Sequence, residues 1–399
     1  MQTLSFTGLL VVAAIALGAP LLVGLVPGIR VPAVVLEIVA GIAVGPSGFG
    51  WVKVDVPIQV LSLIGLAFLL FLAGLEIDVT KLRGPVLRSA GLGFLLTLAL
   101  GVVVGLGFAA TGWVKSPLLI AIALSATSLG LVVPVLKDAG QVEQPVGQLT
   151  IAGASVADFA AVILLSLLFS ETSGSTGGRL LILGLFVVLA AMTVLTLARL
   201  ERSARLEGVL VRLQDTTAEI RVRFAVLLLV AFVAAAGKLG LETILGAFLA
   251  GAILGLVDRD TMTHPNFHLK LEAIGYGFVI PVFFVSSGLR FDLKALLDSP
   301  SGFVRVPLFL LALLVVRGVP AALYASTVGR RRAVAAGLLQ ATSLPFLVTA
   351  TSIGVTLGEI KPITAAALVS AGLLSVVIFP LVAVTLLRES PPSQLLASR

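Results

Sequence analysis

Long apolar segments separated by short polar connections make up almost the whole chain. A helix needs about 20 residues to cross the hydrocarbon core, and strands of membrane barrels are shorter and alternate in polarity. The pattern therefore predicts an all-α polytopic membrane protein with 13 transmembrane helices. We place these segments at residues 4–27, 30–47, 57–76, 85–111, 116–136, 146–170, 179–198, 220–237, 241–257, 271–289, 302–328, 333–357 and 362–387.

The composition supports a membrane protein, and the distribution of positive charge predicts its orientation in the membrane. Hydrophobic residues make up 58% of the chain and charged residues 12%, whereas soluble domains carry about 25% charged residues. Connections after odd-numbered segments, counted with the adjoining segment ends and the C-terminal tail, hold 18 Lys and Arg residues, and connections after even-numbered segments, counted in the same way, hold 8. Positive charge favours the cytoplasmic side, so we expect a multi-pass protein of the cell membrane with its N-terminus outside and its C-terminus in the cytoplasm. The net charge of +7 is explained by topology and does not indicate nucleic acid as a partner.

The sequence gives no indication of an enzyme. It has no cysteine and two histidines, and it has no phosphate-binding loop or Ser–His–Asp pattern. We therefore expect neither catalysis nor a cofactor.

Three short strings recur in the same order in the two halves of the chain. Because the offset is seven segments, an odd number, the second copy would enter the membrane upside down, which gives two inverted six-helix repeats. Inverted repeats are typical of secondary transporters, although chance similarity between Gly- and Ala-rich helices is the alternative. The strings are AGIAVG (40–45) with AGAILG (250–255), GLEID (74–78) with GLRFD (288–292), and ATSL at both 126–129 and 341–344.

Two charged residues lie at the centre of apolar segments. Asp158 is in the sixth segment and Arg317 in the eleventh. Charges inside a membrane are costly and mark functional sites by default. A proton and a metal ion could compete for such a carboxylate. A structural ion pair between the two residues is the alternative interpretation.

The duplicated ATSL strings place hydroxyl groups next to helix breakers. Thr127 and Ser128 precede Gly130, and Thr342 and Ser343 precede Pro345. This combination predicts two crossing broken helices, whose free carbonyl groups could bind a cation. The alternative is close helix packing through small residues.

Several strings resemble the sodium/proton exchanger domain of the monovalent cation:proton antiporters, in particular the Kef/Nap-type branch. The most diagnostic lies within IGLAFLLFLAGLEIDV, and the resemblance covers nearly the whole chain. It implies a homodimer with dimerisation helices at 1–80 and 219–298 and transport helices at 81–172 and 299–388. Residues 173–218 would form a linker helix and basic cytoplasmic loop, and 389–399 a cytoplasmic tail. The strings are LEIVAGIAVGPSGFG (36–50), IGLAFLLFLAGLEIDV (64–79), ALSATSLGLVVPVLKDAG (123–140) and LGAFLAGAILG (245–255).

The resemblance also implies roles for the polar residues. Asp158 would bind proton and monovalent cation in turn, with Thr127, Ser128 and Ser155 as further candidate ligands, and Arg317 would compensate charge in the core. The second crossing helix would contribute Thr342 and Ser343. The protein would exchange Na⁺ or K⁺ for H⁺ by elevator-type alternating access.

The chain departs from the family pattern at Ala157, where many members carry Asp, Gln or Asn. A single carboxylate that exchanges one proton for one cation predicts electroneutral transport. It also suggests that Arg317 pairs with empty Asp158. The short sequence after residue 387 leads us to expect no nucleotide-binding domain. The alternatives are a cation channel or uniporter on the same scaffold, and a non-transporting membrane protein derived from an antiporter.

Overall fold

The computed structural model shows an all-helical chain with irregular connections. It describes residues 6–25, 32–76, 84–169, 176–201, 212–213, 216–257, 266–297 and 300–388. The predicted cytoplasmic tail and most of the predicted basic loop lie outside the described residues. The chain divides into two compact units, which are described separately.

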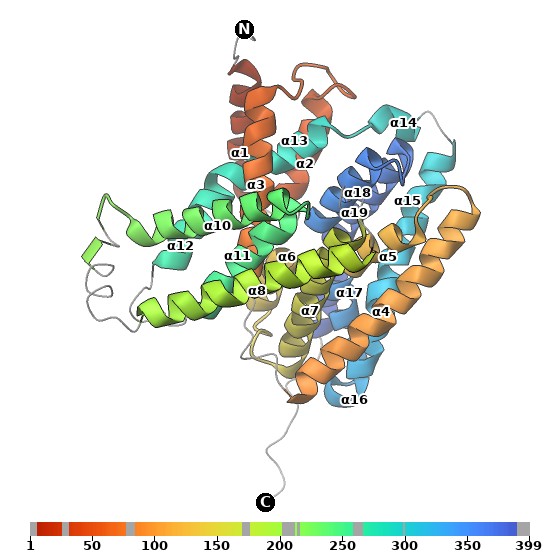
Figure 1. Ribbon diagram of the computed structural model, residues 1–399. Helices are drawn as coiled ribbons and strands as arrows, with labels where there is room; N and C mark the ends of the chain where they lie inside the picture. Colours follow the sequence, from red (N-terminus) through yellow and green to blue (C-terminus); the bar gives the residue numbers. More distant parts are fainter. Residues whose placement is uncertain are drawn as a thin grey trace, which may run out of the picture. The chain divides into compact units, whose positions relative to one another are not determined.

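Unit 1 comprises residues 1–27, 33–79 and 162–291. Its described α-helices, labelled in Figure 1, are α1 (Thr7–Leu25), α2 (Ala33–Val44), α3 (Val56–Leu75), α8 (Thr176–Glu201), α10 (Ile220–Lys238), α11 (Thr243–Val257), α12 (Phe267–Ile274) and α13 (Ile280–Leu289). The π-helical turn η1 (Gly275–Val279) connects α12 to α13.

Glycine allows two helices of unit 1 to pack with their backbones in close approach. A Cβ atom on Gly251 of α11 would lie 1.9 Å from the carbonyl oxygen of Phe71 in α3. A Cβ atom on Gly74 of α3 would lie 2.1 Å from the carbonyl oxygen of Phe248 in α11. Small residues at a crossing are how membrane helices gain contact without a hydrophobic driving force, so these two glycines fix the α3–α11 distance.

Unit 2 comprises residues 28–32, 80–161 and 292–399. It contains α4 (Gly84–Ala110), α5 (Pro117–Ser125), α6 (Leu129–Asp138), most of α7 (Pro145–Phe169), α14 (Leu293–Leu297), α15 (Pro300–Leu313), the π-helical turn η2 (Leu314–Gly318), the 3₁₀ helix η3 (Val319–Tyr324), α16 (Ala325–Val328), α17 (Arg330–Gln340), α18 (Pro345–Thr356) and α19 (Pro362–Arg388).

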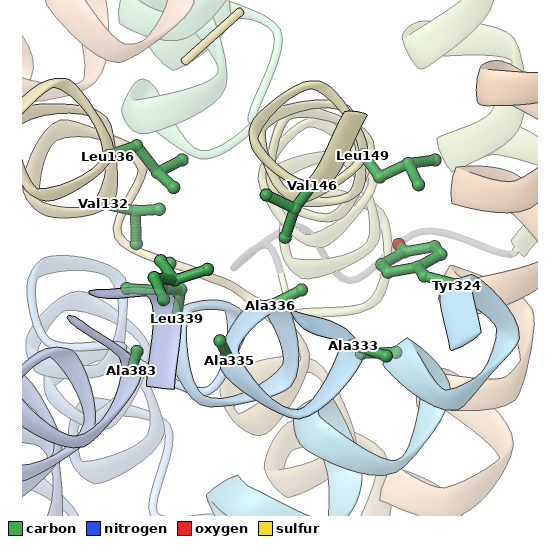
Figure 2. Close-up of a cluster of buried hydrophobic side chains, with 12 residues drawn as sticks. Val132, Leu136, Val146, Leu149, Tyr324, Ala333, Ala335, Ala336, Leu339 and Ala383 are labelled. Atoms are coloured by element: carbon green, nitrogen blue, oxygen red, sulfur yellow. The ribbon is translucent and has the colours of Figure 1, made fainter. Parts of the chain in front are cut away.

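A buried apolar cluster joins five elements of unit 2. Figure 2 shows Val146 of α7 facing Ala336 of α17, and Leu149 of α7 beside Tyr324 of η3. Leu339 of α17 lies in the same cluster. The cluster also takes side chains from α6 and α19, so one helix next to each ATSL string, α6 and α17, lies in the same core.

The number of helices that can cross a membrane is nine in the described part of the chain, or ten if the bent pair α17 and α18 counts as one span. These long apolar helices show a multi-pass membrane protein. Three further apolar segments are shorter than 18 residues: Ala33–Val44, Pro117–Val133 and Thr243–Val257. The count of 13 crossings and the inversion of the repeats therefore stay predictions.

Candidate ion-binding site

Both ATSL strings interrupt a helix in unit 2, as the sequence predicts. The first interruption, residues 126–128, separates α5 from α6, and the second, residues 341–344, separates α17 from α18. The two helices of the second pair meet at an angle of 44°. Pro345 supplies the first residue of α18, where its missing N–H and fixed φ are tolerated. Each interruption frees backbone groups that need new partners.

The two interruptions supply those partners to each other. The N–H of Ser128 donates to the carbonyl oxygen of Thr342 at 2.8 Å. The Ser128 hydroxyl oxygen accepts from the N–H of Leu344 at 3.0 Å. The Thr127 hydroxyl donates to the carbonyl oxygen of Gln340, the last residue of α17, at 2.7 Å. The broken helices therefore contact each other at their breaks.

Asp158 lies on α7 beside the first interruption. Its carboxylate oxygen Oδ1 accepts a hydrogen bond from the N–H of Thr127 at 2.8 Å. Thr127 stands two residues before α6 begins at Leu129, so the carboxylate faces the positive end of that half-helix. The side chain is only partly buried, unlike the other polar groups around the breaks. Asp158 is thus held by the backbone and keeps part of its surface accessible.

Arg317 is buried with 2% of its surface exposed, and it points to oxygen atoms. Its guanidinium donates to the Thr127 hydroxyl through Nε at 3.0 Å and through Nη2 at 2.5 Å. Nε also reaches the Gln340 carbonyl at 3.4 Å, which places a cation at the negative end of α17. Nη2 and Nη1 reach the carbonyl oxygen of Gly153 and the hydroxyl of Thr97, each at 3.4 Å.

A direct ion pair between Arg317 and Asp158 is not among the contacts that the described residues make. Thr127 separates the two side chains, because its N–H bonds the carboxylate and its hydroxyl bonds the guanidinium. Neither the structural ion pair nor the pairing of Arg317 with empty Asp158 is present in this structure. The physical reason is that the guanidinium has a nearer acceptor in Thr127 and compensates the end of α17 instead.

The second interruption bonds to a serine of α19. The N–H of Ser343 donates to the hydroxyl of Ser375 in α19 at 3.2 Å, and that hydroxyl donates to the carbonyl oxygen of Gly372 at 2.7 Å. The Ser343 hydroxyl is fully buried without a hydrogen-bond partner. The two interruptions therefore differ in charge: the start of α6 faces a carboxylate, and the start of α18 faces neutral hydroxyls.

The structure brings most of the sequence-predicted residues together. Thr127, Ser128, Asp158 and Arg317 belong to one hydrogen-bonded network. Ser155 is buried three residues before Asp158 in α7. The second copy contributes differently from the prediction. The Thr342 side chain donates to the carbonyl oxygen of Leu338 in the preceding helix α17 at 3.2 Å, and Thr342 joins the network through its backbone carbonyl.

Four residues of the network were not predicted from the sequence: Gln340, Tyr324, Ser375 and Thr97. Gln340 directly precedes the second ATSL string and is a polar amide inside an apolar segment, which was an available signal. The inferred repeat pairs the sixth segment with the thirteenth, so it could have directed attention to Ser375 as well. Thr97 carries no local signal, because threonine is tolerated in membrane helices.

Comparison with known proteins assigns the chain to a family. The family model described as "Sodium/hydrogen exchanger, transmembrane" matches residues 13–389. The chain belongs to the sodium/hydrogen exchanger family. The family is one of transporters, which confirms the expectation of a transporter rather than an enzyme. The assignment to the Kef/Nap-type branch stays a prediction.

Curated relatives from several organisms support family membership. The protein YjbQ of Bacillus subtilis is 31% identical over 370 residues, which cover 88% of this chain and 58% of that protein. The "Na(+)/H(+) antiporter" of Enterococcus hirae is 31% identical over 275 residues, covering 66% of this chain and 67% of that protein. This chain therefore spans between about half and two thirds of the length of these two members of the sodium/hydrogen exchanger family.

A solved structure shares the fold. The sodium proton antiporter MjNhaP1 from Methanocaldococcus jannaschii matches with a TM-score of 0.64, and the match covers 96% of this chain and 98% of that chain. Sequence identity is 16%, so the likeness shows the architecture of a sodium/hydrogen exchanger and carries no residue roles.

Proposed function

We propose that this protein is a secondary antiporter that exchanges H⁺ for a monovalent cation, with Asp158 binding the two in turn. The observation that carries the proposal is the position of Asp158, a partly buried carboxylate held against the first interruption by the Thr127 N–H. A carboxylate in this setting can be neutralised by a proton or by a cation, and the two exclude each other because both occupy the same oxygen atoms. The similarity to the Na(+)/H(+) antiporter of Enterococcus hirae and to the sodium proton antiporter MjNhaP1 supports Na⁺ as the cation, and K⁺ is the alternative substrate.

The surroundings of Asp158 suit a monovalent cation better than a multivalent one. Among the residues that the structure describes, no three His, Cys, Asp or Glu side chains form a metal-binding group. The candidate ligands are the carboxylate, the hydroxyls of Ser128 and Ser155, and carbonyls freed by the interruption, whereas the Thr127 hydroxyl is already bonded to Arg317 and to the Gln340 carbonyl. Hard oxygen ligands with one negative charge match the charge of Na⁺ or K⁺.

Charge counting supports electroneutral exchange. Ala157 directly precedes Asp158 and is completely buried. Because an alanine side chain carries no titratable group, Asp158 has no second carboxylate beside it at this position. Arg317 cannot readily release its proton, and its hydrogen bonds go to neutral oxygens. One proton at Asp158 is therefore exchanged for one cation, and no net charge moves.

Unit 2 is the proposed transport body, because it contains Asp158, Arg317 and both interruptions. We assign transport helices to residues 81–172 and 299–388 and dimerisation helices to residues 1–80 and 219–298. Residues 173–218 are the proposed linker helix and basic loop. In this proposal the protein is a homodimer with 13 crossings in two inverted repeats, an external N-terminus and a cytoplasmic C-terminus, and it works by elevator-type alternating access.

The test is proton flux in proteoliposomes that hold the purified full chain, followed with a pH-sensitive dye during pulses of Na⁺, K⁺ or Li⁺. The wild type is expected to release protons on addition of its cation, and Asp158→Asn to lose this response because the amide cannot exchange a proton for a cation. Asp292→Asn is the matched control, since Asp292 is an exposed aspartate in the connection before α14. Cation flux without proton flux would instead indicate a uniporter, and exchange that survives in Asp158→Asn would overturn the role of Asp158.

A further inference from the structure

We propose that Gln340 and Tyr324 are positioning residues for cation binding, and that they hold the Arg317 guanidinium on Thr127 and away from Asp158. This inference rests on the proposed function of Asp158 and adds two residues to it. Gln340 and Tyr324 are called the amide–phenol pair below.

Gln340 connects the charged network to a second, neutral one. Its backbone carbonyl accepts from the Thr127 hydroxyl at 2.7 Å and from Arg317 Nε at 3.4 Å. Its side-chain nitrogen Nε2 donates to the Tyr324 hydroxyl at 3.1 Å and reaches the Thr150 carbonyl at 3.5 Å. Gln340 is 1% exposed. A buried amide group without its partners costs about 1–3 kcal/mol, so the side-chain contacts restrain the backbone carbonyl that faces Arg317.

Tyr324 is fixed from two directions. Its ring belongs to the apolar cluster with Leu149 of α7 and Ala333 of α17, as Figure 2 shows. Its chain position ties it to Arg317, because the π-helical turn that carries Arg317 runs directly into the 3₁₀ helix that ends at Tyr324. π-helical turns are uncommon and often mark functional sites. The phenol therefore couples the Arg317 element to the end of α17.

Gly153 places the amide–phenol pair against the helix that carries Asp158. A Cβ atom on Gly153 would lie 2.3 Å from Gln340 Nε2 and 2.6 Å from the Tyr324 hydroxyl. Its carbonyl also accepts from Arg317 Nη2 at 3.4 Å. Any side chain at position 153 must therefore displace the amide–phenol pair. Glycine at this position leaves the space that the Gln340 amide and the Tyr324 hydroxyl occupy.

If the amide–phenol pair no longer restrained the Gln340 carbonyl, the Arg317 guanidinium would change its hydrogen-bond acceptors. Arg317 stays charged, and a buried charge that loses acceptors seeks others. Asp158 is one residue away in the network, since Thr127 contacts both side chains. A guanidinium that moved onto the carboxylate would compete with the incoming cation. The amide–phenol pair thus acts on cation affinity while it touches neither the cation nor Asp158.

The experiment compares Tyr324→Phe and Gln340→Leu with the wild type in the same proteoliposome assay, with initial exchange rates measured over a range of Na⁺ concentrations. Loss of one hydrogen bond of about 1 kcal/mol corresponds to roughly a fivefold change in an equilibrium constant. We expect each variant to raise the apparent KM for Na⁺ about five- to tenfold and to keep a maximal rate within about twofold of wild type. Tyr276→Phe is the matched control, because Tyr276 is the other tyrosine of the chain and lies in unit 1.

A lower rate at all Na⁺ concentrations with an unchanged KM would overturn the inference, since it would indicate only a loss of folded protein. A double variant gives a second criterion. Gly153→Ala disturbs the same contact as Tyr324→Phe, so the double variant should raise the KM by less than the product of the two single effects. Independent, multiplying effects would contradict a shared positioning role.

A readout that does not depend on transport separates the inference from the proposed function. A hydrophobic carbodiimide modifies protonated carboxyl groups in membranes, and the extent at Asp158 can be measured by mass spectrometry. An Arg317–Asp158 contact should slow the reaction in Gln340→Leu relative to wild type. If the wild type shows no exchange but Gln340→Leu is protected, the proposed function fails and the positioning role stands. If the wild type exchanges and the variant changes neither KM nor modification, the positioning role fails.

Discussion

Thr127 forms hydrogen bonds with both charged side chains of the network, Asp158 and Arg317. Its N–H bonds Asp158 and its hydroxyl both accepts from Arg317 and donates to Gln340. The side chain is buried, with 2% exposed. We predict that Thr127→Val, which keeps the shape and removes the hydroxyl, takes the shortest-bonded acceptor from Arg317 and one donor from the Gln340 carbonyl, and costs about 1–3 kcal/mol.

The measurements for Thr127→Val are the thermal unfolding midpoint of the purified protein and its rate of Na⁺-driven proton exchange. Both should fall. Thr127→Ser keeps the hydroxyl and should remain close to wild type in both. If Thr127→Val and Thr127→Ser behaved alike, the hydroxyl would not be holding Arg317.

At the scale of elements, the two interruptions bond to different groups on neighbouring helices. The segment just before α18 depends on the Ser375 hydroxyl, which accepts from the Ser343 N–H at 3.2 Å and is completely buried. A buried N–H that loses its hydrogen-bond partner typically costs about 1–3 kcal/mol. We predict that Ser375→Ala lowers the unfolding midpoint of the purified protein measurably.

Ser370→Ala is the matched control for Ser375→Ala on the same helix. The Ser370 hydroxyl donates to the carbonyl oxygen of Ala366, within α19, and is only partly buried. Its loss frees no helix terminus and should change stability by less than about 0.5 kcal/mol. An equal shift in the two variants would show that Ser375 stabilises α19 rather than the start of α18.

At the scale of the whole molecule, the charge moved in one cycle follows from the number of carboxylates at the site. With Ala157 beside a single Asp158, one proton and one cation change places. We predict that an imposed membrane potential of either sign leaves the initial exchange rate of the wild type unchanged. The rate is measured in proteoliposomes with a K⁺ diffusion potential set by an ionophore, and Na⁺ is the exchanged cation. A rate that follows the sign of the potential would contradict electroneutral exchange.

The orientation of the chain can be tested on its natural background, because the sequence contains no cysteine. Lys115, in the connection between α4 and α5, and Thr327, in α16, are both exposed. The positive-inside pattern places the first outside and the second in the cytoplasm. We predict that Lys115→Cys reacts with an impermeant maleimide on intact cells and that Thr327→Cys reacts only after permeabilisation. The opposite pattern would reverse the proposed topology.

The features of this protein that depend on local pattern could be predicted from its sequence. Long apolar segments are helical because hydrocarbon offers no partner to backbone groups, and nine or ten of them have the length of a span in the described part of the chain. The interruptions at both ATSL strings followed from hydroxyls beside helix breakers. Asp158 and Arg317 stood out because charges in apolar segments are costly.

Which polar groups form hydrogen bonds with each other depends on the tertiary structure and could not be predicted from the sequence. Arg317 and Thr127 are 190 positions apart, and their contact depends on how four helix ends pack. The sequence suggested that Arg317 would pair with Asp158, but it could not show that Thr127 and Gln340 offer nearer acceptors. In segments that are apolar on every face, hydrophobic periodicity does not tell the buried side from the lipid side, so neighbours cannot be assigned. For that reason Gln340, Tyr324 and Ser375 joined the network only once the helices were placed in space.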